Sequence, residues 1–123
     1  MPLKALWNQS ITGKGVKIAV FDTGISEQFE KDNSKNIIDK TNWTNEKFGT
    51  LDLSGHGTAV TSIIQNKNPL CTGIAKDSHL YILKVFNKEK ETHTSWILNA
   101  FDYIFEKQID IINFSIGGLD FTD

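Results

Sequence analysis

The sequence has few of the residues that mark specialised classes of protein. It contains one cysteine, Cys71, and two prolines in 123 residues. A single cysteine excludes an internal disulfide and any metal site built from several cysteines, and so little proline excludes a proline-rich linker. No apolar run approaches the roughly 18 residues that a membrane-spanning helix needs. The formal net charge is only −2, which argues against a nucleic-acid-binding surface.

The remaining composition is that of a folded globular protein. Hydrophobic residues make up 39% of the chain and charged residues 23%, so enough apolar side chains are present to form a core. The length suits one domain or part of one. Neither an internal repeat nor a low-complexity linker divides the chain, so residues 1–123 are expected to belong to one folded unit.

Three short apolar runs predict the strands of the protein. They occupy residues 16–21, 80–86 and 109–116. Each run is rich in β-branched or aromatic residues and is nearly continuous instead of alternating with polar residues. This pattern is typical of strands that are covered on both faces, as in a parallel sheet. The most polar stretch, residues 27–40, is interpreted as a surface excursion.

Two helical patterns lie between these runs. Residues 58–64 form a short apolar stretch after a glycine, and residues 94–108 place apolar side chains at helical spacing, with Thr94 or Ser95 as the expected N-cap. The alternation of strands and helices predicts right-handed crossovers and an α/β fold. We expect a three-layer, doubly wound, mostly parallel sheet with helices on both faces, incomplete in this chain. Functional groups in such sheets lie beyond the carboxyl ends of the strands.

Two motifs contain side chains that could take part in catalysis, and both lie where that architecture places functional groups. Asp22, in the motif Asp-Thr-Gly, directly follows the first predicted strand, so its carboxylate would be partly desolvated and would need a partner. His56, in the motif Gly-His-Gly-Thr, opens the first predicted helix. The helix dipole disfavours an imidazolium there, so a nearby carboxylate would be needed to compensate. Taken separately, each motif also fits an ordinary turn at the end of a strand or the start of a helix.

A third motif closes the last predicted strand. Residues 113–118 read Asn-Phe-Ser-Ile-Gly-Gly, and the two glycines remove side chains along a backbone edge. A peptide could then add to that edge as an extra strand, held by main-chain hydrogen bonds. Taken alone, the motif also fits a plain exit from a strand into a turn.

The three motifs together, in this order and at these separations, resemble the subtilisin-like serine proteases, peptidase family S8. The resemblance rests on residues 20–25, 55–58 and 113–118. Residues 13–20 also fit the segment that precedes the first motif in that family. The resemblance covers nearly the whole chain from Trp7 onward. Residues 41–46 and 94–103 further resemble one branch of the family, distinct from the bacterial enzymes.

The resemblance implies a serine endopeptidase that acts by Ser-His-Asp acyl transfer. Asp22 would be the carboxylate of the catalytic triad and His56 its general base, with Asp22 accepting the Nδ1 proton of the imidazole. Asp52, four residues before His56, is a rival orienting acid, and we expect it to be a solvated loop residue. The substrate-binding wall would be formed by Ser115, Ile116, Gly117 and Gly118.

In this family the nucleophilic serine lies in a Gly-Thr-Ser-Met-Ala-like motif well downstream of the third motif. The asparagine that stabilises the oxyanion also lies downstream, so both are expected beyond residue 123. Residues 1–123 are therefore expected to be the amino-terminal part of a single peptidase catalytic domain, and to be inactive alone. Ser115 matches the substrate-binding motif and is not expected to be the nucleophile.

The resemblance also carries expectations about partners and location. The partner would be a peptide or protein substrate, with no nucleic acid. The branch implies the secretory pathway, on the lumenal side of the endoplasmic reticulum or Golgi membrane, with any membrane anchor outside this chain. The chemistry needs no cofactor. Many relatives bind structural calcium through loops, but no loop here is rich enough in Asp and Asn to name ligands.

Two other functions remain open from the residues. The chain could be a non-catalytic peptide-binding module, or pseudoprotease, because it contains no nucleophile motif. Asp-Thr-Gly is also the signature of aspartic proteases, which are almost entirely β and need two such aspartates facing each other. The predicted helix over 94–108 argues against that second alternative.

Overall fold

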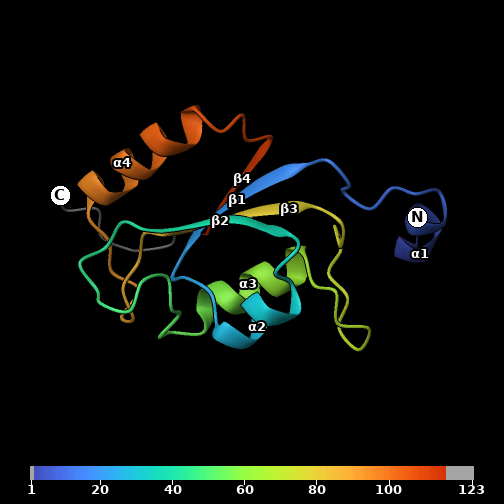
Figure 1. The fold of residues 1–123 in the computed structure, drawn as a ribbon, viewed down its shortest axis with the longest axis horizontal. Helices are drawn as coiled ribbons and strands as arrows, with labels where there is room; N and C mark the ends of the chain where they lie inside the picture. The colour runs from blue at the N-terminus through green and yellow to red at the C-terminus, as the bar shows by residue number, and fades with distance from the viewer. Residues whose placement is uncertain (1, 116–123) are drawn as a thin grey trace.

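The computed structural model describes residues 2–115, and its centre is a sheet of four parallel strands. The strands are β1 (Lys17–Asp22), β2 (Ile37–Asn42), β3 (His79–Lys84) and β4 (Ile111–Phe114). Their spatial order is β2-β3-β1-β4, with every neighbouring pair parallel (Figure 1). The strand β1 is therefore central, and its carboxyl end, which carries Asp22, lies between those of β3 and β4.

Helices cover both faces of this sheet. The helices α2 (Glu27–Asp32) and α3 (His56–Ile64) lie on one face, and α4 (Thr94–Phe105) lies on the other (Figure 1). A further short helix, α1 (Leu3–Asn8), stands apart near the N-terminus. The structure thus has the α/β architecture that the sequence predicts, with helices on both sides of a parallel sheet.

Alternate residues of the central strands form two separate cores. Ala19 and Phe21 of β1 pack on the α4 side, against a cluster that includes Ala100 and Ile104. The intervening residues Ile18 and Val20 point to the other face, where α2 and α3 cover them; this second cluster includes Phe29, Leu80 and Ile82. Burial of both faces explains why β1 and β3 read as continuous apolar runs rather than as alternating ones.

Residues 27–40 differ from their sequence-based interpretation as a surface excursion. They contain α2 and most of β2, and the interpretation was wrong because β2 is an outer strand of the sheet. One face of an outer strand is open to water, so its side chains alternate between half-buried and exposed, and its apolar run is correspondingly short. The helix α2 is capped by Ser26, whose Oγ accepts the backbone N–H of Phe29 at 3.1 Å.

The boundaries of α4 also differ slightly from prediction. The residue at the N-cap is His93, which makes no side-chain capping bond, and the helix ends at Phe105. The expected cap at Thr94 or Ser95 was wrong, because both residues already lie inside the first turn. His93 instead packs its ring edge-on against Trp96, with the centroids 4.4 Å apart.

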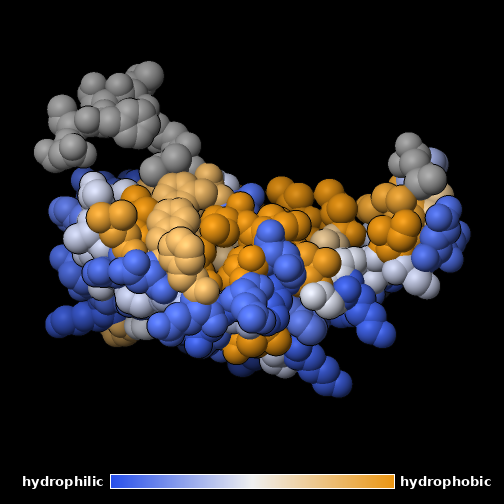
Figure 2. All heavy atoms as spheres, turned by 90° about the horizontal axis from the view of Figure 1, so that it is seen from above, coloured by the Kyte–Doolittle hydropathy of each residue, from blue (hydrophilic) through white to orange (hydrophobic). Residues whose placement is uncertain are grey.

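The edge formed by β4 leaves apolar side chains uncovered. Ile111 and Ile112 of this strand are 52% and 42% exposed, and Phe105 at the end of α4 is also exposed. Apolar atoms gather on the face seen from above in Figure 2, the side on which α4 and β4 lie in Figure 1. Within residues 2–115, no helix combines the length and hydrophobicity that crossing a bilayer requires.

Candidate active site

Asp22 ends the central strand as a buried carboxylate. Its side chain is only 3% exposed. One oxygen, Oδ1, accepts the backbone N–H of Thr23 at 2.7 Å and lies 2.8 Å from Nδ1 of His56. A buried carboxylate needs such partners, because the hydration that it loses must be replaced by hydrogen bonds or by a positive charge.

His56 is the first residue of α3 and faces Asp22 from across the end of the sheet. The helix starts after Gly55, which adopts a left-handed conformation with φ of 91°. With Nδ1 donating to the Asp22 carboxylate, the second ring nitrogen, Nε2, is left as an acceptor. The His56 side chain is 38% exposed, so the pair combines a buried acid with an imidazole that solvent and substrates can reach.

A close approach of backbone to backbone brings the two residues together. A Cβ added at Gly57 would lie 2.5 Å from the carbonyl oxygen of Gly24. A side chain at position 57 would therefore force α3 away from the turn after β1. This explains why His56 is followed by glycine: the helix must start within contact distance of the strand end that carries Asp22.

Asp52 is not the solvated loop residue that we expected from the sequence. Its Oδ1 accepts hydrogen bonds from Thr23 Oγ1 at 2.7 Å and from the backbone N–H groups of Ser54 and Gly55 at 3.1 and 2.8 Å. Its Oδ2 accepts from the backbone N–H and the hydroxyl of Thr58 at 2.9 and 2.6 Å. These bonds close the N-terminal turn of α3, so Asp52 acts as the anchor of the helix that carries His56.

Thr23 links this anchor to the strand. Its hydroxyl donates to Asp52 and accepts the backbone N–H of Gly57 at 2.8 Å. Burial of Asp52 raises the pKa of that carboxyl, but hydrogen bonds from Thr58, Thr23 and Gly55 outweigh burial and lower its pKa below the ordinary value of 3.8. Asp52 is thus held as a carboxylate, directed at the backbone of α3 and not at the imidazole of His56.

The Asp22–His56 pair opens into a pocket of about 240 Å³. Its other lining residues are Thr23, Phe86, Lys90 and Ser115. Ser115 is exposed, and its Oγ accepts a hydrogen bond from Asn113 Nδ2 at 3.0 Å. The structure therefore places Ser115 beside the pair.

The rest of the predicted substrate wall, Ile116, Gly117 and Gly118, lies outside the described residues. The catalytic and substrate-binding roles of all these positions stay predictions.

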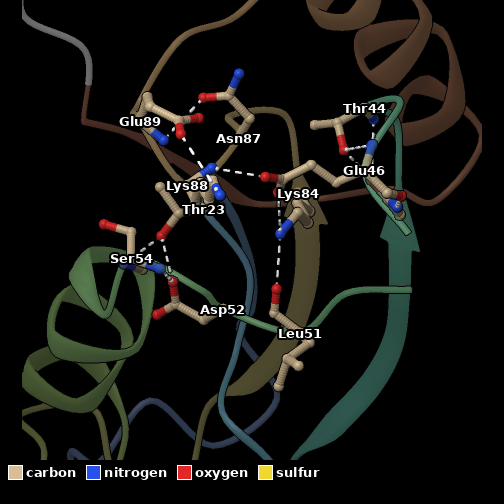
Figure 3. Close-up of polar contacts among 12 residues, drawn as sticks. Thr23, Thr44, Glu46, Leu51, Asp52, Ser54, Lys84, Asn87, Lys88 and Glu89 are labelled. Carbon is tan, nitrogen blue, oxygen red and sulfur yellow. Dashed lines mark hydrogen bonds and ion pairs between the residues drawn. The ribbon is translucent and has the colours of Figure 1, made fainter. Parts of the chain in front are cut away.

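Sequence reasoning missed one buried ion pair near this site. Lys84, at the end of β3, is 0% exposed and lies 2.8 Å from Glu46 Oε1 (Figure 3). Its Nζ also donates to the carbonyl oxygen of Leu51 at 2.6 Å. Burial of Glu46 raises the pKa of that carboxyl. The hydrogen bonds from the Lys84 ammonium and the Lys88 backbone, with the positive charges of both lysines, outweigh burial and lower the pKa. The only sequence signal was a lysine inside an otherwise apolar strand.

The parallel sheet contradicts the aspartic-protease alternative, because those enzymes are almost entirely β whereas Asp22 here ends a strand of an α/β sheet. The subtilase family profile matches residues 13–122. The chain belongs to the subtilase family.

Individual subtilases are similar over almost the whole chain. Human membrane-bound transcription factor site-1 protease is 47% identical over 119 residues, which cover 96% of this chain and 11% of the relative. Subtilisin-like protease SBT6.1 of Arabidopsis thaliana is 44% identical with the same coverage. The intracellular serine protease of Paenibacillus polymyxa is 38% identical over 93% of this chain and 36% of its own length.

These comparisons bear on the branch within the subtilase family. Residues 41–46 and 94–103 predicted a branch other than the bacterial one, namely that of site-1 protease, and the identity is higher to site-1 protease than to the bacterial enzyme. The chain spans about a tenth of the length of the site-1 proteases that it matches. Among residues 2–115, no group of three or more His, Cys, Asp or Glu side chains could hold a metal ion, so structural calcium stays a prediction for which we name no ligands.

Proposed function

We propose that this subtilase sequence belongs to a serine endopeptidase that cleaves protein substrates by acyl transfer, with Asp22 and His56 as two members of its triad. One observation carries the proposal: the buried carboxylate of Asp22 lies 2.8 Å from Nδ1 of the accessible His56. That geometry suits a general base whose tautomer and orientation are held by a carboxylate.

The chemistry that this pair would perform is proton transfer. Nε2 of His56 would remove the proton of a serine hydroxyl as that oxygen attacks the substrate carbonyl, and would later return the proton to the leaving amine. Asp22 would stabilise the imidazolium in between. The sequence of 123 residues contains no Gly-Thr-Ser-Met-Ala-like motif, so in this proposal the serine comes from sequence beyond these residues, and the chain alone is inactive.

Substrate binding would use the wall that starts at Ser115. The main chain of residues 115–117 would pair with an extended peptide, and Gly118 would leave room for its side chains. This would place a scissile bond over the pocket beside His56. The similarity to proteins named membrane-bound transcription factor site-1 protease supports extending the proposal to a lumenal location in the secretory pathway, next to a membrane.

The decisive experiment compares the full-length gene product with its His56→Ala variant. Both would be treated with a fluorophosphonate probe and assayed for hydrolysis of a peptide library, and the labelled residue would be mapped by mass spectrometry. We expect hydrolysis and labelling of a serine outside residues 1–123 in the parent, and loss of hydrolysis in the variant. Labelling of Ser115 would contradict our assignment of the nucleophile.

The same experiment tests the alternative of a non-catalytic peptide-binding module. This alternative rests on the missing nucleophile motif in these 123 residues. A full-length product that binds peptides but neither hydrolyses them nor reacts with the probe would favour it over the endopeptidase.

A further inference from the structure

The segment between β2 and α3, residues 43–55, has few apolar contacts to hold it in place. Its Phe48 side chain is 75% exposed, and Leu53 is also exposed. Trp43, at the start of the segment, packs against the α4-side core. The remainder depends on polar contacts, yet it must be placed accurately because Asp52 and the start of α3 follow directly from it.

Lys84 contacts this segment at three points. Its backbone carbonyl accepts the N–H of Trp43 at 2.9 Å. Its Nζ pairs with Glu46 at 2.8 Å and donates to Leu51 O at 2.6 Å (Figure 3). The side chain is fully buried, so these contacts compensate an ammonium that has no access to water.

The contact with Leu51 lies one residue before Asp52, which anchors the start of α3. The backbone N–H of Asp52 donates to Ile25 O at 3.2 Å, and that of Ile25 donates to Thr50 O at 2.9 Å. These bonds tie residues 50–52 to the turn after β1. Asp52 then holds the amides of Gly55 and Thr58, and His56 lies between these two residues.

Lys84 also has a fixed relation to the acid of the pair. In the register of β1 with β3, Lys84 is the partner of Asp22. Partners in adjacent parallel strands present their side chains to the same face of the sheet. Asp22 and Lys84 therefore lie side by side at the end of the sheet. Asp22 contacts His56 directly, and Lys84 contacts the segment that leads to His56.

We propose that Lys84 is a positioning residue for His56, acting through residues 50–52 and the Asp52 anchor. The effect of Lys84 on catalysis rests on the proposed peptidase function. The effect of Lys84 on the position of His56 does not. The positioning role predicts that loss of the ammonium loosens the start of α3 more than it loosens the core of the sheet. A purely stabilising buried ion pair would affect both regions equally.

The test uses NMR on the full-length gene product with selective isotope labelling of glycine, threonine, valine and histidine. Amide hydrogen exchange would be measured at Gly55 and Thr58, which donate to Asp52, and at Val20 in the sheet core. The low-field Nδ1 proton signal of His56 would report its bond to Asp22. In Lys84→Met we expect exchange at Gly55 and Thr58 to rise at least about tenfold relative to Val20, together with broadening or loss of the His56 signal.

A second variant separates positioning from charge burial. Lys84→Met leaves the partly buried carboxylate of Glu46 without its cation, and this alone can destabilise the fold. The double variant Lys84→Met, Glu46→Gln removes that uncompensated charge but still lacks the donor to Leu51. We expect it to recover the exchange protection of Val20 while Gly55 and Thr58 stay fast.

The matched control is Lys40→Met. Lys40 also pairs with a glutamate, Glu30, but this pair is partly exposed and joins β2 to α2, so this variant should leave the amides of α3 and the His56 signal unchanged. Parent-like protection at Gly55 and Thr58 in a folded Lys84→Met chain would overturn the proposal. Two further outcomes would also overturn it: a loss of exchange protection at Val20 equal to that at Gly55 and Thr58 in both Lys84 variants, or failure of both variants to fold. In either case Lys84 would support the fold as a whole. None of these readouts depends on hydrolysis, so a failure here is distinct from a failure of the proposed function.

Discussion

Asp22 and His56 show how two ordinary side chains become a reactive pair through their surroundings. Asp22 is buried at the end of the central strand, and His56 is partly open to solvent. The carboxylate meets the imidazole at Nδ1, which leaves Nε2 directed to other partners. The arrangement depends on glycine at position 57, because any Cβ there would collide with the carbonyl oxygen of Gly24.

At the residue scale, we predict that Asp22→Asn in the full-length protein lowers kcat by about 10⁴. The amide can hold the wrong tautomer of His56 and cannot stabilise an imidazolium. Steady-state peptide hydrolysis measures this effect, and Asp102→Asn, an exposed position on α4, serves as the control with unchanged turnover. A loss of less than tenfold for Asp22→Asn would remove Asp22 from the proposed mechanism.

At the element scale, the helix α3 is held at its start by one carboxylate instead of by an N-cap side chain. Its N-cap residue is Gly55, which has no side chain to offer. Asp52 takes over that function from three residues upstream, by accepting from Ser54, Gly55 and Thr58. The negative charge also lies at the positive end of the helix dipole.

We predict that Asp52→Ala lowers the free energy of unfolding by about 1–3 kcal/mol at neutral pH, because several donors lose their acceptor. The folded-state pKa of Asp52 lies below its ordinary value of 3.8. Its contribution is therefore complete above that value and is lost as the pH falls through the lower, folded-state pKa. Urea unfolding between pH 2 and 7 would measure this, and the difference between parent and variant should shrink at the acid end.

The control for this prediction is Asp32→Asn. Asp32 is an exposed residue whose carboxylate accepts a hydrogen bond from Gln28 on its own helix, so this variant should change the free energy of unfolding little at any pH. A difference between the parent and Asp52→Ala that stays constant down to pH 2 would contradict the assignment of the effect to the Asp52 carboxylate.

At the scale of the whole molecule, the described part of the chain ends in an apolar edge. Ile111 and Ile112 of β4 and Phe105 of α4 are exposed. Phe101, Ile104 and Ile109 join Ile112 around a hollow between α4 and β4. An outer strand with uncovered apolar side chains pairs readily with another strand or with another copy of the chain.

We predict that the isolated 123-residue chain associates with itself in a concentration-dependent way, and that Ile112→Lys shifts it towards monomer. A lysine on the edge opposes strand pairing because its charge must stay in water. Sedimentation velocity across a range of concentrations measures the effect. Ile63→Lys, an exposed position on α3 away from this edge, is the control that should not change association, and equal effects of the two variants would contradict the role of the β4 edge.

Local patterns were sufficient to predict the strands β1 and β3, the helix α4 and the facing positions of Asp22 and His56. A buried strand shows as a continuous apolar run, and Asp22 stands at the carboxyl end of such a strand, where functional groups gather. The pairing of Asp22 with His56 came from the resemblance and from the need of an imidazole at a helix start for a nearby carboxylate. The outer strand β2 was not predicted because it has no fully buried residue, and exposed and half-buried side chains alternate at its start, so its sequence resembles a loop.

The sequence by itself therefore determined the α/β class, the subtilase family and the position of the acid–imidazole pair, because each depends on short runs or motifs read within a few residues. Only the tertiary structure decided the roles of Asp52 and Lys84. The partners of both charged side chains come from distant parts of the sequence, which meet where the chain crosses the end of the sheet. No local pattern records these contacts. They turn a loop aspartate and a strand lysine into residues that hold the site in place.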